Sequence, residues 1–312
     1  ARQLIHDPGF CHRHRTNPSC FTRRRRLNFM SVLTLLLQKT VRSIQAHLHD
    51  FFEALAPDLP TVTPASWCEA RLKLRHTAFI ELNERAILEV VYGGQSDFAA
   101  RRWQTHRLLG IDSSLIRLPN RAALGKEFGW AECANQAGAS GRYPQGRLSV
   151  LTDVLNRIAI QTFLRPWQQG ERDLAREHME RMEPEDLALL DRGFASYELF
   201  ARFVARQRWF VCRCPTSSFG IVNQLFQDDQ AGRSVIFTLR PSSHAQAQVR
   251  QAGLPLEIQV RFVAVRLETG QLEVLATNLL EESGYPTGEF KELYNYRWGI
   301  ESFYAQIKGR LD

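Results

Sequence analysis

The sequence predicts an α/β fold: a mixed sheet flanked by helices, with a helical region before it and a β-rich insertion within it. Helical periodicity dominates residues 1–100, and short apolar strands alternate with amphipathic helices from 106 to 215. Residues 216–286 return to strands, which are joined by Gly and Pro turns. The apolar fraction of 44% and the charged fraction of 23% are those of a globular protein. They exclude disordered, collagen-like and coiled-coil proteins.

The N-terminal region, residues 1–104, is predicted to be helical. Apolar residues recur there at helical spacing, Thr63-Pro64 supplies an N-cap followed by a proline suited to the first turn, and Gly93-Gly94 ends the last helix. The expected helices cover residues 27–56 (as one or two helices), 64–74 and 78–91.

Positive charge is concentrated at the N-terminus. The chain has 40 Lys and Arg against 33 Asp and Glu, and residues 1–50 alone hold nine cations and two acids. Four consecutive cations stand out, Arg23, Arg24, Arg25 and Arg26. Such a basic arm suits a polyanion. A solubilising tail is the alternative.

Cysteine content and hydropathy predict a protein of a reduced, cytosolic compartment with no membrane span. The six cysteines are too few and too scattered for a disulfide scaffold. The apolar run at 27–37 is too short to cross a bilayer and lacks a signal-peptide cleavage site. Four residues could be zinc ligands, but the usual paired spacing is missing. They are Cys11, His12, His14 and Cys20.

From residue 106 the order of expected elements is three strands, a helix, a strand, a helix and a strand. The second and third strands meet in a tight hairpin at Asn156-Arg157. The expected strands are 108–111, 148–155, 157–164, 187–190 and 209–212, with helices at 171–182 and 196–206. In the insertion, strands are expected at 235–239, 258–267 and 272–276, and a last helix covers 289–310.

Two aspartates follow apolar strands and are candidate site residues. Asp112 ends Leu109-Gly110-Ile111, and Asp191 ends Leu189-Leu190. Carboxylates at the carboxyl ends of core strands converge at the edge of the sheet where ligands bind in open α/β folds. Asp153 is a weaker candidate because it lies inside its strand. A lone aspartate of this kind is usually a cap or a turn former.

The last helix carries a row of polar residues, Tyr294, Arg297, Glu301 and Lys308. At about 100° per residue they fall within an arc of roughly 60°. An apolar stripe occupies a different arc, so we expect the polar row to lie clear of the core. Taken alone, the row is also what a solvated face with an Arg297–Glu301 pair would show.

Together these residues resemble a known family. The spacing Tyr294-x2-Arg297-x3-Glu301-x6-Lys308 resembles the Tyr-Arg-Glu-Lys motif of the DD-E transposases of bacterial insertion sequences, specifically the insertion-sequence-four family. Asp112 resembles the first aspartate of that family, and Asp191-Arg192-Gly193-Phe194 resembles its second motif. The resemblance covers residues 106–312 and implies an RNase H-like core. The core would comprise residues 105–215 and 287–312, with the β-strand insertion of the family at 216–286 and a DNA-binding region at 1–104.

The resemblance implies metal-dependent cleavage of DNA at the element ends, followed by strand transfer by a DNA 3′-OH. Asp112, Asp191 and Glu301 would hold two Mg²⁺ ions, with Mn²⁺ as a substitute. Tyr294, Arg297 and Lys308 would contact DNA phosphates. The implied partners are double-stranded DNA, as terminal inverted repeats and target, and a second copy in a homodimeric synaptic complex. The implied location is the bacterial cytoplasm, in association with the nucleoid.

Two other functions remain open at this point. One is an RNase H-fold nuclease that cuts DNA without joining it. The other is a catalytically inactive or truncated DNA-binding remnant of a transposase. The chain begins with Ala and ends four residues after Lys308, where family members continue with further helices. We therefore expect a fragment or a truncated gene product in which pairing of two element ends is affected.

Overall fold

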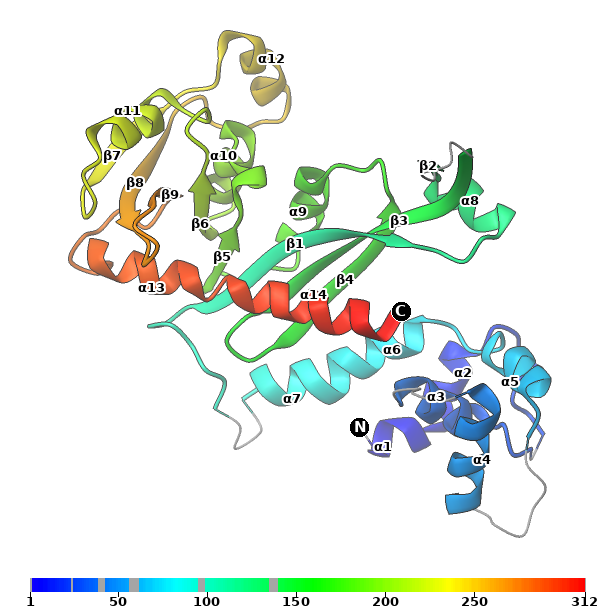
Figure 1. Cartoon of the computed structure of the whole chain (residues 1–312). Helices are drawn as coiled ribbons and strands as arrows, with labels where there is room; N and C mark the ends of the chain where they lie inside the picture. Colours follow the sequence, from blue (N-terminus) through cyan, green and yellow to red (C-terminus); the bar gives the residue numbers. More distant parts are fainter. Residues whose placement is uncertain are drawn as a thin grey trace. The chain divides into compact units, whose positions relative to one another are not determined.

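The computed structural model describes residues 2–23, 25–38, 43–55, 62–94, 99–134 and 140–311. The chain divides into two compact units, Ala1–Ala100 and Arg101–Asp312. In Figure 1 the first unit is blue to cyan, and the colours of the second run from cyan-green to red. The first unit is helical, and the second holds the sheet.

The first unit is built from short helices. They are α1 (Arg2–His6), α2 (Pro8–His14), α3 (Phe29–Leu37), α4 (Ile44–Leu55), α5 (Pro64–Arg71), α6 (Thr77–Asn83) and α7 (Glu89–Tyr92). The side chain of Thr63 caps α5, and Pro64 lies in its first turn, as predicted. A π-helical turn, Glu84–Leu88, joins α6 to α7. The helix predicted over 78–91 is therefore present, with one wider turn inside it.

The N-terminal segment belongs to the folded unit instead of forming an extended arm. The carboxylate of Asp7 caps α2 by accepting hydrogen bonds from the N–H groups of Gly9 and Phe10. Phe10 is fully buried and packs edge-to-face against Phe29. Helices α1 and α2 were not predicted, because segments of five and seven residues are too short to show helical periodicity.

Glu81 connects α6 to α2. Its carboxylate accepts hydrogen bonds from Arg13 Nε at 3.0 Å and pairs with His14 Nε2 at 2.7 Å. The hydrogen bond from Arg13 is the main reason that the pKa of Glu81 falls to about 2. The described residues contain no group of three or more His, Cys, Asp or Glu that could hold a metal ion. The four zinc candidates around His14 are therefore not gathered into such a group.

The second unit is organised around one mixed sheet. Its strands are β1 (Arg107–Arg117), β2 (Trp130–Ala134), β3 (Ser140–Asp153), β4 (Ile158–Pro166), β5 (Asp186–Leu190), β6 (Trp209–Cys214), β7 (Ser234–Leu239), β8 (Ile258–Arg266) and β9 (Leu272–Thr277). The strand order is β2-β3-β1-β5-β6-β9-β8-β7, and β4 pairs with β3. β5 is parallel to both β1 and β6, whereas the other pairs are antiparallel.

The central part of this sheet has the RNase H-like arrangement. Strands β1, β3 and β4 form an antiparallel meander, and β5 and β6 then add in parallel on the other side of β1. Helix α9 (Glu171–Met179) lies between β4 and β5 in the chain, and α10 (Tyr197–Ala205) lies between β5 and β6. The predicted fold class is confirmed. The excursion between β1 and β3, with α8 (Ala122–Phe128) and β2, was not predicted.

The predicted hairpin joins β3 to β4. Asp153 pairs with Ile158 across it, and Arg157 has a positive φ of 56° in its turn. The buried carboxylate of Asp153 accepts hydrogen bonds from the N–H groups of Leu155 and Asn156. Asp153, the weaker site candidate, therefore serves to close this turn.

The segment between β6 and the last helices contains strands and two helices. The three predicted strands are present as β7, β8 and β9, and α11 (Gly220–Asp228) and α12 (Ser243–Gln251) accompany them. Strand β9 pairs antiparallel with β6, so the three strands continue the central sheet. The two helices were not predicted.

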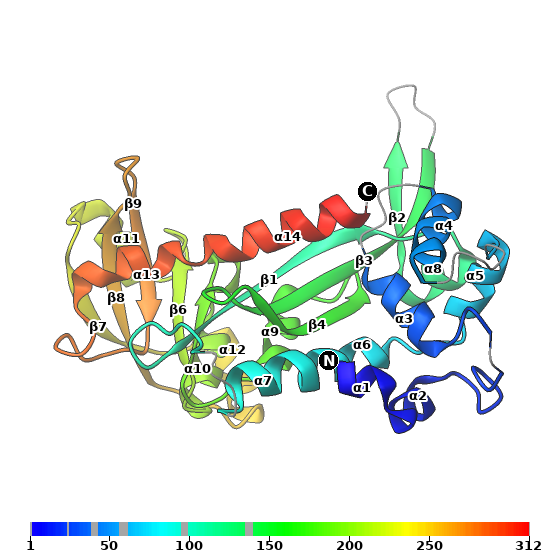
Figure 2. The same ribbon diagram turned by 90° about the horizontal axis from the view of Figure 1, so that it is seen from below.

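The chain returns to the sheet through two helices, α13 (Phe290–Asn295) and α14 (Trp298–Leu311). Figure 2 shows α14, in red, running beside β1. Ile300 and Tyr304 of α14 are buried and belong to a small apolar cluster with Val150 of β3. Within the described residues, no helix is long and apolar enough to cross a membrane.

Candidate active site

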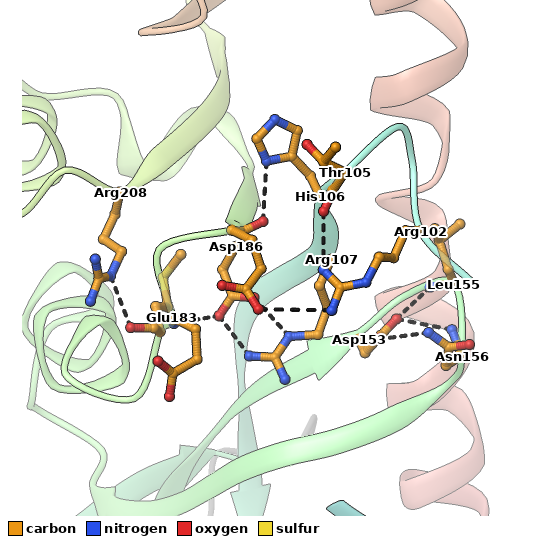
Figure 3. Close-up of polar contacts among 12 residues, drawn as sticks. Arg102, Thr105, His106, Arg107, Asp153, Leu155, Asn156, Glu183, Asp186 and Arg208 are labelled. Atoms are coloured by element: carbon orange, nitrogen blue, oxygen red, sulfur yellow. Dashed lines mark hydrogen bonds and ion pairs between the residues drawn. The ribbon is translucent and has the colours of Figure 1, made fainter. Parts of the chain in front are cut away.

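Polar contacts anchor the first residues of β1 to β5. Arg107 Nε and Nη2 each donate a hydrogen bond of 2.7 Å to the carboxylate of Asp186. Both side chains are almost fully removed from solvent, and burial raises the pKa of Asp186 although Arg107 opposes the change. His106 Nδ1 adds a contact of 3.1 Å to the carbonyl of Glu185. Figure 3 shows this group at the start of the two strands.

The register that follows brings the two candidate aspartates level. Arg107 pairs with Asp186, and Gly110 pairs with Leu189. Two residues further along the chain are Asp112 and Asp191. Because neighbouring strands lie about 4.8 Å apart, this register sets the two backbones side by side.

The sequence suggested that the strand ends at Asp112, but the strand continues beyond this residue. β1 continues to Arg117, and its residues are buried as far as Ile111 and half-buried or exposed beyond. The apolar run ends at Asp112 because the strand leaves the core there, while its ladder with β3 continues. An apolar run reports burial, so it could not show where the hydrogen-bonded strand ends.

The carboxylate of Asp112 lies in a poorly solvated, negatively charged environment. Burial raises its pKa to about 6, and the charges of Glu171 and Asp191 add to the effect. The N–H of Ser113 donates to Asp112 Oδ1 at 2.7 Å and acts in the opposite direction, as does the charge of Arg297. From α14, the hydroxyl of Tyr304 donates to the backbone carbonyl of Asp112 at 2.7 Å.

Asp191 directly follows β5 and begins a 3-10 turn, Arg192–Phe194. Its backbone carbonyl accepts a hydrogen bond from the N–H of Phe194 at 3.0 Å. The thiol of Cys212 also lies 3.5 Å from this carbonyl. Among the described residues, Asp191 Oδ1 is buried with no hydrogen-bond partner. A buried carboxylate oxygen without a partner is costly unless a ligand occupies the site.

The expected last helix is interrupted, and its polar row is partly buried. α13 ends at Asn295 and α14 begins at Trp298, with i to i−3 hydrogen bonds across the junction. Tyr294 and Arg297 are only 4% and 5% exposed. The prediction of one continuous helix with this row clear of the core was wrong there, because the junction turns both side chains toward β5 and α14.

Tyr294 and Arg297 contact the site from this junction. The hydroxyl of Tyr294 donates to the carbonyl of Leu190, directly before Asp191, at 3.3 Å, and burial raises the pKa of Tyr294. Arg297 Nη2 donates to Glu301 Oε1 at 2.8 Å. Burial lowers the pKa of Arg297, but Tyr294, Glu301 and Asp191 outweigh this and raise it overall. Arg297 Nε is buried with no hydrogen-bond partner among the described residues.

The remaining predicted residues are placed as follows. Glu301 lies in the first turn of α14 with a half-exposed side chain. Position 308 lies within α14, but the side chain of Lys308 is outside the described residues, and so is the whole of Arg24. Arg23 and Arg25 are exposed in the first unit, and the guanidinium of Arg26 lies 4.8 Å from the centre of the Phe52 ring.

Comparison with known proteins shows the family of this chain. Residues 103–312 match the family described as "Transposase DDE domain". The chain belongs to that family. The matched range contains the sheet, both aspartates and the Glu301 helix, so the candidate site residues lie within the part of the chain that matches this family.

Two more specific similarities accompany the family match. The chain is 23% identical over 256 residues to "Transposase InsG for insertion sequence element IS4" from Escherichia coli (strain K12). That alignment covers 80% of this chain and 54% of the relative, so the chain spans about half the length of the curated protein. The solved structure "Cryo-EM structure of piggyBac transposase synaptic complex with hairpin DNA (SNHP)" gives a TM-score of 0.44 at 12% identity. It covers 89% of this chain and 57% of the other.

Three further residues of this DDE domain approach Asp112 and were not predicted. Glu171, at the start of α9, accepts hydrogen bonds of 2.7 Å from both Ser113 Oγ and Arg147 Nη1. An acidic residue in the first turn is common in helices, so Glu171 carried no distinguishing signal. Only the pairing of β1 with β3 and the packing of α9 reveal that these side chains meet.

Proposed function

We propose that this chain is the catalytic part of a DNA transposase that hydrolyses phosphodiester bonds at element ends and joins the freed 3′-OH to target DNA. The observation that carries the proposal is the level placement of Asp112 and Asp191 on neighbouring segments of a DDE domain, with Glu301 on the helix packed beside β1. Both reactions are displacements at phosphorus, with water or a DNA 3′-OH as the attacking group. They need no protein nucleophile.

The donor set suits divalent cations, for which Mg²⁺ is the proposed species and Mn²⁺ a substitute. The partnerless Asp191 Oδ1 and the Asp112 carboxylate, whose pKa is raised by burial and, to a lesser extent, by neighbouring acids, are hard oxygen donors whose charge a cation would offset. Asp112, Asp191 and Glu301 would hold two ions. When bound, such ions activate the attacking oxygen and stabilise the leaving oxygen. Among the described residues no three such side chains are grouped closely enough to hold an ion, so Glu301 must leave Arg297 to join the aspartates.

The polar residues around the acids orient the substrate and the site. Arg297 and Lys308 are proposed to bind DNA phosphates, Arg297 as a planar fork and Lys308 as a point charge. Tyr294 was expected to contact phosphate as well. Because its buried hydroxyl is engaged by the carbonyl of Leu190, its role in this arrangement is to hold the end of β5 beside Asp191.

Excision from a donor plasmid tests the proposed activity. The plasmid carries the DNA that flanks the gene on both sides of a marker, and wild type is compared with Asp191→Ala in Mg²⁺, Mn²⁺ and EDTA. We expect metal-dependent release of the marker by wild type alone, followed by joining to target DNA. Cleavage without joined products would indicate a nuclease, and retention of the ends in a gel shift without cleavage would indicate an inactive DNA-binding remnant.

The first unit is proposed to bind the terminal inverted repeats. Its exposed cations Arg23 and Arg25 would bind phosphates, as would Arg24. Removing one cation that binds a phosphate should reduce the slope of log K against log salt concentration by about 0.9. A gel shift at several salt concentrations compares R23A/R25A with Arg240→Ala, which removes an exposed arginine between β7 and α12. An unchanged slope in R23A/R25A would contradict this role.

Movement of an element requires that its two ends are brought together. We therefore propose that two copies pair on DNA as a homodimer, in the cytoplasm of a bacterium and in association with its nucleoid. Native mass spectrometry with and without duplex ends measures the stoichiometry. A single copy on each isolated end under conditions of cleavage would contradict the homodimer.

A further inference from the structure

Two neighbouring residues at the start of α9 reach both segments that carry the aspartates. Glu171 Oε1 accepts a hydrogen bond of 2.7 Å from Ser113 Oγ, directly after Asp112. Arg172 Nε donates to the carbonyl of Gly193 at 2.9 Å, and its Nη2 donates to the carbonyl of Ala195 at 3.3 Å. One helix end therefore contacts the residue that follows Asp112 and the turn that follows Asp191.

Arg147 of β3 holds Glu171 in this position. Its Nη1 lies 2.7 Å from Glu171 Oε1 and 3.0 Å from Ser113 Oγ, which closes a three-membered network. Nε and Nη2 of Arg147 also donate to the carbonyl of Trp167. The Arg147 side chain is 16% exposed, so its charge and its contacts restrict the conformations open to Glu171.

Ser113 connects this network directly to the carboxylate of Asp112. The N–H of Ser113 donates to Asp112 Oδ1 at 2.7 Å, so fixing Ser113 also orients that carboxylate. On the other side, a Cβ added to Gly193 would lie 3.6 Å from Glu171 Oε2. The Glu171 carboxylate therefore lies against the turn after Asp191 while it holds the residue after Asp112.

We propose that Glu171 and Arg172 form a clamp that fixes the separation of Asp112 and Asp191 and thereby the affinity of this acidic pair for a divalent cation. The inference rests on the proposed function, because it takes the two aspartates as cation ligands. The proposal makes Glu171 and Arg172 positioning residues, which act on the two aspartates through Ser113 and through the turn after Asp191. Residues that orient metal ligands typically contribute about 10- to 100-fold to metal affinity.

Binding of Mn²⁺ to the full chain without DNA, measured by electron paramagnetic resonance, tests the clamp. We expect Glu171→Gln and Arg172→Ala each to weaken binding about 10- to 100-fold. Glu177→Gln is a matched control, since Glu177 lies on the same helix, pairs with Arg165 at 3.0 Å and is 37% exposed, against 40% for Glu171. It should leave binding unchanged, whereas Asp191→Ala should abolish it.

Hydrogen exchange at residues 109–115 and 191–196 provides a second measurement on the same variants. Faster exchange there in both clamp variants, together with weaker Mn²⁺ binding, is the expected result. Faster exchange with unchanged affinity would overturn the proposal, because the contacts would then stabilise the fold alone. Equal loss of affinity in Glu177→Gln would overturn it too. If wild type binds no Mn²⁺, or Asp191→Ala binds it equally well, the proposed function itself fails, and with it the role of the clamp.

Discussion

Arg297 is 5% exposed, and its guanidinium donates a 2.8 Å hydrogen bond to Glu301, one turn further along the chain. Arg297 lies in the junction between α13 and α14, where one continuous helix was expected, and Glu301 lies in the first turn of α14. The cation of this pair is buried, and the charge of Asp191 helps to raise its pKa, whereas the Glu301 side chain is 43% exposed. The two members of the pair therefore differ in what they contribute to stability.

Replacing Arg297 should affect both stability and activity. We expect Arg297→Ala to lower the free energy of unfolding by about 1–3 kcal/mol, because it removes a buried side chain together with the positive charge that offsets the carboxylate of Asp112. Glu301→Gln should cost less than about 1 kcal/mol, because its side chain is half-exposed, yet it should abolish cleavage. Urea denaturation and the excision assay measure the two effects. Equal destabilisation by both substitutions would contradict this difference.

Arg202→Ala on α10 provides a control for the Arg297 substitution. Arg202 makes a similar pair with Glu198, four residues away, at 2.9 Å. It lies outside the candidate site, so its loss should leave metal-dependent cleavage unchanged.

Asp112→Asn should stabilise the protein at neutral pH while abolishing cleavage. Burial raises the pKa of Asp112 from 3.8 to about 6, so the folded state binds this proton more tightly than the unfolded state. The stability that Asp112 contributes is therefore present below pH 3.8 and is lost as the pH rises through 6. A shift of this size corresponds to about 3 kcal/mol at most.

Urea denaturation in EDTA from pH 4 to pH 8 measures this linkage. Asn cannot ionise, so the advantage of the variant over wild type should grow from near zero at pH 4 to about 1–3 kcal/mol at pH 8. An advantage that does not depend on pH would show that Asp112 does not carry the raised pKa.

Gly110 permits the close approach of α14 to β1. A Cβ at this position would lie 3.0 Å from Val154 Cγ1 and 3.3 Å from Ile300 Cβ. Gly110→Ala should therefore destabilise the unit by about 1–3 kcal/mol and, by displacing α14 with Glu301, reduce cleavage. Gly220→Ala is the matched control, since no atom lies within 4 Å of its added Cβ. Thermal unfolding and the excision assay compare them; equal effects at the two glycines would refute the steric account.

The buried pair of Arg107 and Asp186 should contribute mainly by avoiding an unpaired charge. Asp186→Ala leaves the Arg107 guanidinium without its bidentate partner and should cost about 3–5 kcal/mol. The double variant Arg107→Met, Asp186→Leu should cost much less, because neither charge remains buried. Chemical denaturation measures the free energy of unfolding of both variants. A decrease below about 1 kcal/mol in Asp186→Ala would show that Arg107 finds another partner.

Much of the core could be predicted because its strands are short, apolar and bounded by turns. β5 was predicted within one residue, since its five residues are all buried and an aspartate follows. The prediction was weakest where burial and backbone geometry diverge. β1 continues past Asp112 with half-exposed side chains, and α13 breaks from α14 without a proline at the junction.

Contacts between distant segments could not be predicted from spacing. The sequence singled out Asp112, Asp191 and the polar row because each has a local pattern. Glu171 has none, and its relation to Ser113 depends on how α9 packs against β1 and β3. The burial of Arg297 was missed for the same reason, because helical spacing gives the angle between side chains but not which face is covered.

Strand β9 hydrogen-bonds directly to β6, from Val211 opposite Thr277 to Cys214 opposite Val274. The segment from β7 to β9 is therefore not an exchangeable module attached to a finished core. Excising it would turn β6, which follows the helix after Asp191, into a bare edge strand whose unpaired backbone groups invite aggregation. A shortened relative with this architecture would have to supply another covering for β6, and this requirement constrains how insertions of different size can evolve in the same domain.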